Sequence, residues 1–291
     1  MAATAPTLLP LPRLMLEAIV RAALLEDLGR AGDITTDAVI PPGMQMKGVI
    51  AARQPGVIAG ADAALLAFEL MDPSVRVSIE KPDGSPVCPG DVAITLQGPA
   101  RAILSAERVA LNLMGHLSGV ASATATLVDA VRPHKARIVC TRKTTPGLRA
   151  LEKHAVRAGG GANHRFGLDD AVLIKDNHIA VAGGVRAAIE RARGAVGHLV
   201  KIEVEVDTLA QLDEALATGA DAVLLDNMTP AQLAEAVSRV RKVSGGRTIT
   251  EASGGITLAT VNAVAASGVD LISAGWITHS APVLDLGLDE A

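Results

Sequence analysis

Charged and phosphate-seeking residues accompany five short apolar runs in the second half of the 291-residue chain. The runs and these residues are RIVC (137–140) with Thr141, Arg142 and Lys143; AVLI (171–174) with Lys175; VKIEVEV (200–206) with Glu203 and Glu205; AVLL (222–225) with Asp226; and TITEA (248–252) with Ser253, Gly254 and Gly255. If the runs are parallel strands, their carboxyl ends share one rim, so cations, carboxylates and a glycine turn face a common pocket. Such a pocket suits an anionic substrate beside a metal-bound phosphosugar.

The cations come from two consecutive loops and predict an anion-binding site. Arg142 presents a planar fork suited to a carboxylate or phosphate, and Lys143 adds a point charge. His164 and Arg165 stand in a glycine-flanked loop, and Lys175 directly follows an apolar run. Like charges in a partly desolvated pocket repel one another, whereas charge-assisted bonds to a bound anion return about 1.5–3 kcal/mol each. The cluster is therefore typical of a pocket that a polyanion fills.

Other interpretations of these residues stay open from the sequence alone. Two adjacent cations at a strand end are often only a solvated rim. His164 can instead bond the backbone of its own loop, and His178 can cap a helix or lie at the surface. Lys175 can pair with Asp176 or Glu205, or act as a Schiff-base nucleophile.

Two carboxylates at neighbouring strand ends predict a Mg²⁺ site. Glu205 and Asp226 offer oxygen ligands, which substrate phosphates and water complete in the usual arrangement for this ion. Glu203 shares a strand face with Glu205 because side chains alternate along a strand. Salt bridges to Lys143 and Lys175 are the alternative for these acids, and both roles can coexist.

Small residues after the last two predicted strands indicate a phosphate site. A helix is predicted to begin near Thr257, and free amides at a helix start form the common phosphate cradle of β/α barrels. A glycine pair can also be a plain tight turn. The residues concerned are Ser253, Gly254 and Gly255, and then Ser273, Ala274 and Gly275 at the end of a sixth strand, LISAG (271–275).

Strands that alternate with helices predict an α/β domain with a parallel sheet over residues 115–279. A barrel is favoured over an open doubly wound sheet, because polar residues follow every strand instead of one switch point. Six clear units fall short of eight, so an incomplete barrel-like domain of six to seven parallel strands is expected. The predicted helices lie near 148–158, 185–193, 209–218, 230–243 and 258–267.

The preceding part of the chain predicts a small N-terminal α+β sandwich domain over residues 1–114, on which the tail 280–291 packs back. Short β-like pieces alternate with glycine and proline turns there, and a long helix connects the two domains, either whole or broken near Gly115 or Gly119. The expected elements are a helix at 14–28 stopped by Gly29, β pieces between Gln45 and Gly98, a helix at 62–71 and the long helix at 102–131.

Composition excludes several classes of protein. The net charge is only −4 without a long basic block, so the electrostatic footprint of nucleic-acid binding is missing. Phe68, Phe166 and Trp276 are the only aromatic residues, too few for stacking bases. Cys88 and Cys140 lack metal-ligand spacing and fit a reducing cytosol.

Targeting and nucleotide-binding signals are also missing. The first residues are not expected to be a secretion signal, and no apolar run is long enough for a membrane span, so a cytoplasmic location is expected. Neither GxGxxG after a first strand nor GxxxxGK[ST] occurs, so dinucleotide and P-loop sites have no support.

Motifs along nearly the whole chain resemble the quinolinate phosphoribosyltransferase family, the carboxylating nicotinate-nucleotide pyrophosphorylases. They are EDLGRAGDITTDAVIP, SAERVALNLMGHLSG, TRKTTPGLR, HRFGL, LIKDNH, IEVEVD, LLDN, EASGGI and ITHSAPVLDLGLD. The resemblance implies that quinolinate and phosphoribosyl pyrophosphate react to give nicotinate mononucleotide, pyrophosphate and CO₂ in de novo NAD biosynthesis, with Mg²⁺ required. It also implies an N-terminal α/β sandwich, a barrel-like domain of fewer than eight strands, and a homodimer or a larger assembly.

The resemblance also implies residue roles, with Lys143, Lys175, Glu205 and Asp226 as the catalytic set. Arg108 matches the arginine that the partner subunit donates in this family. Thr141, Arg142, Lys143, His164, Arg165 and Lys175 would hold quinolinate and part of the phosphosugar; Glu205 and Asp226 would face the ribose hydroxyls and Mg²⁺; Ser253, Gly254, Gly255, Ser273, Ala274 and Gly275 would bind the 5′-phosphate. Trp276 replaces a small residue of the family, which puts the shape of the adjacent loop in doubt.

Three alternative functions remain. One is a related phosphoribosyltransferase with another acceptor, such as the molybdenum-associated paralogues. Another is a phosphosugar aldolase that uses Lys175 as a Schiff-base nucleophile. The third is a non-catalytic anion-binding barrel that kept the fold and lost the reaction.

Overall fold

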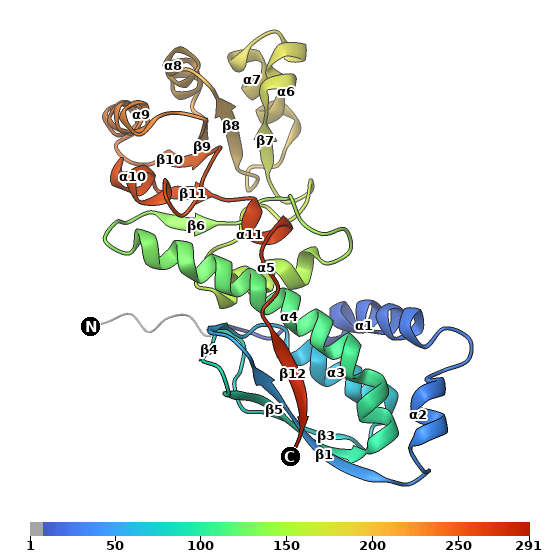
Figure 1. Cartoon of the computed structure of the whole chain (residues 1–291). Helices are drawn as coiled ribbons and strands as arrows, with labels where there is room; N and C mark the ends of the chain where they lie inside the picture. Colours follow the sequence, from blue (N-terminus) through green and yellow to red (C-terminus); the bar gives the residue numbers. More distant parts are fainter. Residues whose placement is uncertain (1–7) are drawn as a thin grey trace. The chain divides into compact units, whose positions relative to one another are not determined.

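The computed structural model describes residues 8–291, which form two compact units that interleave along the chain (Figure 1). Unit 1 contains the chain up to Ala125, residues 144–160 and residues 277–291; unit 2 contains residues 126–143 and 161–276. The prediction placed residues 1–114 and the tail 280–291 in one domain and residues 115–279 in the other. In the structure the first boundary instead lies within α4 (Ala100–Val131), and residues 144–160 also join unit 1. The prediction about a secretion signal lies partly on residues 1–7, outside the described residues.

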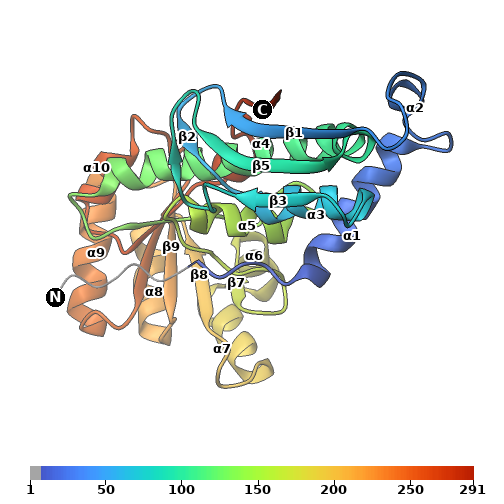
Figure 2. The ribbon, with the colours of Figure 1, turned by 90° about the horizontal axis from the view of Figure 1, so that it is seen from below.

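Unit 1 is built on a four-stranded antiparallel sheet in the order β12-β1-β5-β3. Its C-terminal strand pairs with β1, and Ile50 of β1 lies between Ile94 of β5 and Leu288 of β12. Figures 1 and 2 show α3 and the first part of α4 over one face of this sheet. The strands are β1 (Gln45–Ala52), β3 (Arg76–Ile79), β5 (Val92–Pro99) and β12 (Leu286–Glu290), with a separate pair β2 (Gly56–Val57) and β4 (Pro86–Val87).

Most helices of unit 1 follow the predicted apolar spacing, but the one at residues 34–39 was not predicted. The helices are α1 (Arg13–Leu28), α2 (Ile34–Val39), α3 (Ala61–Met71) and α5 (Arg149–Ala158), and the short α11 (Trp276–His279) begins at the last residue of unit 2. Among residues 8–291, none of the helices combines the length and apolar character needed to span a bilayer.

Gly115 and Gly119 do not break α4, which is one continuous helix. A Cβ atom at Gly119 would lie 2.1 Å from the backbone oxygen of Pro282, and one at Gly115 would lie 3.0 Å from the backbone oxygen of Leu284. The backbone N–H of Leu284 also donates to the Gly115 carbonyl at 3.0 Å. These glycines therefore allow the C-terminal segment to pack directly on the helix backbone.

Unit 2 contains a six-stranded parallel sheet in the order β6-β11-β10-β9-β8-β7. Consecutive strands from β7 to β11 are neighbours, and β11 returns beside β6, which is the order of a barrel opened between β6 and β7. The predicted barrel-like α/β domain is confirmed, with six strands. They are β6 (Arg137–Val139), β7 (Val172–Ile174), β8 (Ile202–Val206), β9 (Ala222–Asp226), β10 (Ile249–Ser253) and β11 (Leu271–Ser273).

Helices connect these strands and are delimited by local capping. Thr208 and Thr229 each accept the backbone N–H three residues later and start α8 and α9, while Gly219 and Gly245 end them in the left-handed conformation. Figure 2 shows α8 and α9 outside the sheet. The helices are α6 (Asp176–Ala182), which was not predicted, α7 (Val185–Ala195), α8 (Leu209–Thr218), α9 (Pro230–Ser244) and α10 (Val261–Ala266).

Strand register sorts the side chains of this sheet onto two different faces. Glu205 of β8, Leu224 of β9 and Glu251 of β10 are register partners and share a face with Glu203. The opposite face is apolar and buried, and it includes Val204, Val206, Val223, Leu225 and Ile272. The sheet therefore places its acidic residues together on the face that does not carry this apolar packing.

Candidate active site

The carboxyl ends of β7 and β8 bring a cation and a carboxylate into contact. Lys175 Nζ lies 2.6 Å from Glu205 Oε2; the lysine side chain is 48% exposed, whereas that of Glu205 is only 12% exposed. Register explains the contact, because Ile174 pairs with Val204 and the next residues follow side by side. The contact is the salt bridge that the sequence offered as an alternative role for Glu205.

Two arginines from separate loops approach each other in the same unit. Burial lowers the pKa of Arg165, and the positive charge of Arg142 lowers it further, while Asp170 and Glu203 act in the opposite direction. Arg165 also donates from Nη1 to the carbonyl of Ala171 at 3.2 Å. Two neighbouring guanidinium groups are suited to an anion with more than one negative charge.

The adjacent residues Thr141 and Lys143 form a local turn. The backbone N–H of Lys143 donates to Thr141 Oγ1 at 3.0 Å, and the Lys143 side chain is exposed. The turn therefore lies in the loop that follows β6 and also contains Arg142.

His164 makes contacts from both ring nitrogens. Its Nδ1 accepts the backbone N–H of Arg165 at 2.7 Å, and its Nε2 lies 2.9 Å from Glu203 Oε2. The loop-backbone interpretation of this histidine is therefore observed. His178 acts as a helix cap, since its Nδ1 accepts the backbone N–H of Lys175 at 2.9 Å.

Asp226 is held by the residue that follows it. Asn227 donates from Nδ2 to Asp226 Oδ2 at 2.6 Å and from its backbone to the carbonyl of Ser253 at 2.9 Å. Asn227 has a φ of 52°, and it is the one non-glycine residue with positive φ in the described part of the chain. Gly254 has a φ of 90°, and a Cβ atom there would lie 2.1 Å from Asn227 Oδ1. The glycine turn and the Asp226 turn therefore interlock.

The surroundings of the predicted phosphate loop differ in part from expectation. The following helix begins at Val261 and not near Thr257, and residues 257–260 form a turn in which Thr260 Oγ1 accepts the Thr257 N–H at 2.9 Å. The backbone N–H of Ala274 is donated to Val139, and Ser273 is buried with its hydroxyl 3.4 Å from a strand carbonyl. A hollow of ≈ 330 Å³ adjoins the loop, lined among others by Asn227, Gly254, Gly255 and Thr260.

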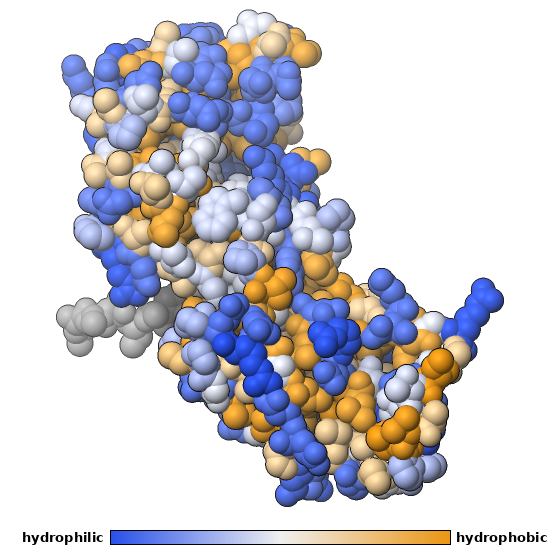
Figure 3. All heavy atoms as spheres, in the orientation of Figure 1, coloured by the Kyte–Doolittle hydropathy of each residue, from blue (hydrophilic) through white to orange (hydrophobic). Residues whose placement is uncertain are grey.

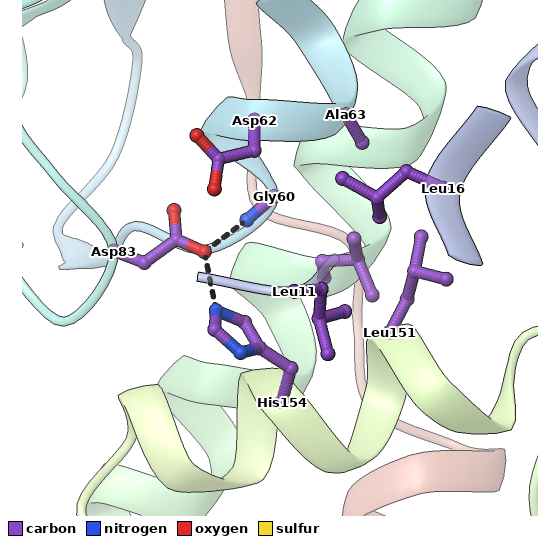
Figure 4. Close-up of a pocket in the computed structure, with 9 residues that line it drawn as sticks. Leu11, Leu16, Gly60, Asp62, Ala63, Asp83, Leu151 and His154 are labelled. Carbon is purple, nitrogen blue, oxygen red and sulfur yellow. Dashed lines mark hydrogen bonds and ion pairs between the residues drawn. The ribbon is translucent and has the colours of Figure 1, made fainter. Parts of the chain in front are cut away.

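The segment after β6 that carries the predicted cations is divided between the two units at residue 143. Residues up to Lys143 belong to unit 2, whereas 144–160 belong to unit 1, where Glu152 is fully buried and lies 2.8 Å from His116 Nε2. His154 lies 3.1 Å from Asp83 Oδ2 beside a small apolar pocket (Figure 4).

The cluster of Asp83, Asp62 and His154 lies at the start of α3. The Asp83 carboxylate accepts the backbone N–H groups of Gly60 and Ala61 at 2.9 and 3.0 Å, which are unsatisfied donors at the start of α3. Asp62 points toward it (Figure 4), and burial, followed by the charge of Asp83, raises the pKa of Asp62. The cluster caps a helix of unit 1.

Arg108 is an exposed residue of α4, and Trp276 is a half-buried residue at the start of α11. The Arg108 side chain is 64% exposed and lies 4.0 Å from Glu107. The Nε1 atom of Trp276 has no hydrogen-bond partner among residues 8–291. Trp276 directly follows Gly275 of the predicted phosphate site, where this bulky side chain replaces the small residue expected from the resemblance.

Two residues near the site were not identified as functional from the sequence. Glu251 stands within the TITEA run, and an acid inside an otherwise apolar strand was the signal available. Asn227 follows Asp226 in the LLDN motif, but its left-handed conformation is not visible in the residue type alone.

The fold and the site define an α/β protein whose barrel-like sheet carries an ionic, anion-attracting rim at the carboxyl ends of its strands. Two family models match the chain: the N-terminal domain of quinolinate phosphoribosyl transferase at residues 33–118 and its C-terminal domain at residues 120–289. The chain belongs to the quinolinate phosphoribosyl transferase family.

Curated relatives and solved structures agree with this assignment over almost the full length. A probable carboxylating nicotinate-nucleotide pyrophosphorylase of Bacillus subtilis is 45% identical over 276 residues, which are 95% of this chain and 93% of the relative. The carboxylating nicotinate-nucleotide pyrophosphorylase of Mycobacterium leprae is 47% identical over 272 residues, which are 93% of this chain and 95% of the relative. The structure of nicotinate-nucleotide pyrophosphorylase from Francisella tularensis has a TM-score of 0.92 at 36% identity and covers 99% of this chain and 100% of its own.

Proposed function

We propose that this protein transfers the phosphoribosyl group of phosphoribosyl pyrophosphate to quinolinate with decarboxylation, giving nicotinate mononucleotide, pyrophosphate and CO₂ in NAD biosynthesis. The observation that carries the proposal is the 2.6 Å contact between Lys175 and Glu205, which joins a cationic and an acidic flank at one rim. Family membership supports the reaction, and the charge distribution supports the substrates.

Quinolinate carries two adjacent carboxylates, and the arginine pair is suited to them. Arg142 and Arg165 each present a guanidinium fork that binds a carboxylate through two parallel hydrogen bonds. Burial, and then the positive charge of Arg142, lower the pKa of Arg165, and a dianion bound between the two groups would offset both effects. Nicotinate has one carboxylate and should bind much more weakly, because one fork would stay uncompensated.

The acidic flank fits a Mg²⁺ ion bound together with substrate phosphates. Glu205 and Asp226 are half-buried oxygen donors, and the known contacts of their side chains use Oε2 and Oδ2, respectively. One or two carboxylates plus substrate phosphates and water are the usual ligands of this ion. Bound there, Mg²⁺ would neutralise charge on the departing pyrophosphate.

The chain's own residues supply position and charge in this proposal. As the C1–O bond to pyrophosphate breaks, positive charge grows on the ribose, and the carboxylates of Glu205 and Asp226 stabilise it. The quinolinate nitrogen, held in place through the arginines, forms the new bond to C1. The adjacent carboxylate then leaves as CO₂, and the electron pair of the broken C–C bond stays on the ring carbon that carried it. That carbon takes up a proton from water, which gives nicotinate mononucleotide. Neither step removes a proton from substrate, so no general base is assigned.

We also propose a homodimer in which Arg108 is donated to the partner's site. Its side chain is exposed on α4. Unit 1 exposes several large apolar side chains on its first helices, and Figure 3 shows an apolar surface near α2, as expected where another subunit packs. They are Leu14 (87% exposed), Leu25 (68%), Ile34 (69%) and Val39 (68%). Cys88 and Cys140 are thiols, which is compatible with the proposed cytoplasmic location.

Pyrophosphate release with quinolinate, phosphoribosyl pyrophosphate and Mg²⁺ tests the function. We expect Arg165→Ala to lower kcat/KM for quinolinate about 10- to 150-fold, from the loss of a charged hydrogen-bond pair worth about 1.5–3 kcal/mol. Arg191→Ala, an exposed arginine of α7 in the same unit, is the matched control and should leave the rate unchanged. No release by the wild type, or equal effects of both variants, would contradict the assignment.

The alternatives predict other outcomes in the same experiments. A related transferase with another acceptor would bind phosphoribosyl pyrophosphate and leave quinolinate unreacted. The aldolase alternative has less support, because the Lys175 side chain is engaged with Glu205 at 2.6 Å. Borohydride should therefore trap no carbonyl adduct on Lys175.

A further inference from the structure

A buried carboxylate lies behind the proposed substrate pocket and is not explained by the reaction. Glu251 stands in the middle of β10 and is 1% exposed. Its Oε2 lies 3.6 Å from His164 Nε2, which is also 2.9 Å from Glu203 Oε2. Glu251 Oε1 has no hydrogen-bond partner among residues 8–291. A buried acid so far from water requires a specific role or a specific partner.

The hydrogen bonds determine the tautomer of His164. The backbone N–H of Arg165 can only donate, so His164 Nδ1, 2.7 Å away, must present its lone pair. In a neutral imidazole the proton is then on Nε2, which points at Glu203 and Glu251. The two acids therefore lie where they stabilise this one tautomer and this one orientation of the ring.

A histidine and two glutamates whose ligand atoms lie within 4.8 Å of one another could also hold a metal ion. The hydrogen-bond pattern argues against that use. A metal would need the lone pair of Nε2, yet Nδ1 already uses its lone pair to accept from Arg165. The neutral ring cannot serve both, so the cluster is better suited to orienting His164 than to coordination.

The charge of the cluster is compatible with its burial. Burial, and then the negative charge of Glu203, raise the pKa of Glu251 to about 8, while His164 and Ser273 act in the opposite direction. On the neighbouring strand β9, the residue in register with Glu251 is Leu224, which carries no titratable group. The raised pKa favours the protonated form of Glu251, which reduces the charge buried in the cluster.

We propose that Glu251 and Glu203 are positioning residues for substrate binding: they hold His164 with its proton on Nε2, and His164 in turn holds the backbone of Arg165 so that its guanidinium faces the anionic acceptor. This inference rests on the proposed function for the identity of the acceptor. The positioning chain runs from β10 and β8 through the loop to Arg165, the residue proposed to bind the acceptor.

Substitutions separate this role from a general structural one. Glu251→Gln keeps the shape of the protonated acid and should retain quinolinate binding. Glu251→Ala should raise the quinolinate KM roughly tenfold to a hundredfold, with little change in the KM for phosphoribosyl pyrophosphate, because misplacement by a fraction of an ångström acts on Arg165 only. Equal changes in both KM values would overturn the proposal, as would equal damage by the Gln and Ala variants.

A second variant tests whether His164 transmits the effect. His164→Asn keeps an oxygen that can accept the Arg165 N–H but removes the link to both acids. Adding Glu251→Ala to His164→Asn should then cause no further loss of quinolinate binding, whereas independent effects would multiply. Multiplying effects would contradict transmission through the ring.

Nitrogen-15 NMR of the seven histidines gives a readout that does not depend on activity. The signals that disappear in His164→Asn belong to His164, and they should show a proton-free Nδ1 and a protonated Nε2 in wild type. The opposite tautomer would overturn the inference. If the wild type shows this tautomer but does not bind quinolinate, the proposed function fails while the positioning geometry stands.

Discussion

Substituting Gly254 by alanine should damage the site through a defined collision with Asn227. The new Cβ atom would lie 2.1 Å from Asn227 Oδ1 and 3.0 Å from the Asn227 backbone nitrogen. The side chain must rotate away, and it then releases Asp226 Oδ2, to which it donates at 2.6 Å. Gly255 is the matched control, because it also has positive φ, 62°, but nothing lies within 4 Å of its Cβ position.

We expect the two variants to differ more in activity than in the folding free energy that a left-handed alanine costs. Each alanine adopts a left-handed conformation, which costs roughly 1–2 kcal/mol of folding free energy. Only Gly254→Ala breaks the charge-assisted bond to Asp226, worth about 1.5 kcal/mol at the lower end because Asn227 is exposed. We therefore expect kcat/KM for phosphoribosyl pyrophosphate to fall about tenfold or more in Gly254→Ala and to stay within about twofold in Gly255→Ala.

The measurement combines initial rates of pyrophosphate release with urea denaturation of both variants. Binding can be followed in parallel by the fluorescence of Trp276, the single tryptophan in a chain without tyrosine. In an Asn227→Gly background the collision is absent, so Gly254→Ala should cause little further loss of activity. Equal losses for Gly254→Ala and Gly255→Ala, or full additivity with Asn227→Gly, would refute the reasoning.

Two further predictions concern stability. Gly119→Ala places a Cβ atom 2.1 Å from the Pro282 carbonyl and should lower the free energy of unfolding by at least about 1–3 kcal/mol, whereas Gly194→Ala, with nothing within 4 Å, should not; equal urea midpoints would contradict this. Burial alone would raise the pKa of Asp270, but hydrogen bonds, led by that from Lys135, lower it. Asp270→Asn should therefore cost about 1–3 kcal/mol at pH 7, and the difference from wild type should shrink as pH falls below about 4 toward the lowered pKa; a pH-independent difference would contradict it.

Local pattern in the sequence was sufficient for much of the fold. Apolar runs of four to seven residues between amphipathic segments predicted the six parallel strands, and β8 alternates as expected, with Val204 buried between Glu203 and Glu205. The period of a strand is a property of consecutive residues, so it can be read without knowing the neighbours. The order of cations, carboxylates and glycines along the chain was visible in the same way.

Contacts between distant residues required the tertiary structure. Lys175 pairs with Glu205, Gly119 makes room for Pro282, and residues 144–160 join unit 1 although they directly follow the cationic loop. None of these follows from composition or spacing, because each depends on which backbone lies opposite.

The sequence by itself determined which charges line the carboxyl ends of the strands, and it placed the chain close to one enzyme family. The structure alone decided how those charges are paired: His164 Nδ1 accepts from Arg165 while Glu251 is buried behind the ring. The reason is physical. Residue type sets charge and hydrogen-bonding capacity, but tautomer, ion pairing and protonation depend on distance and burial, which only the packing of remote segments defines.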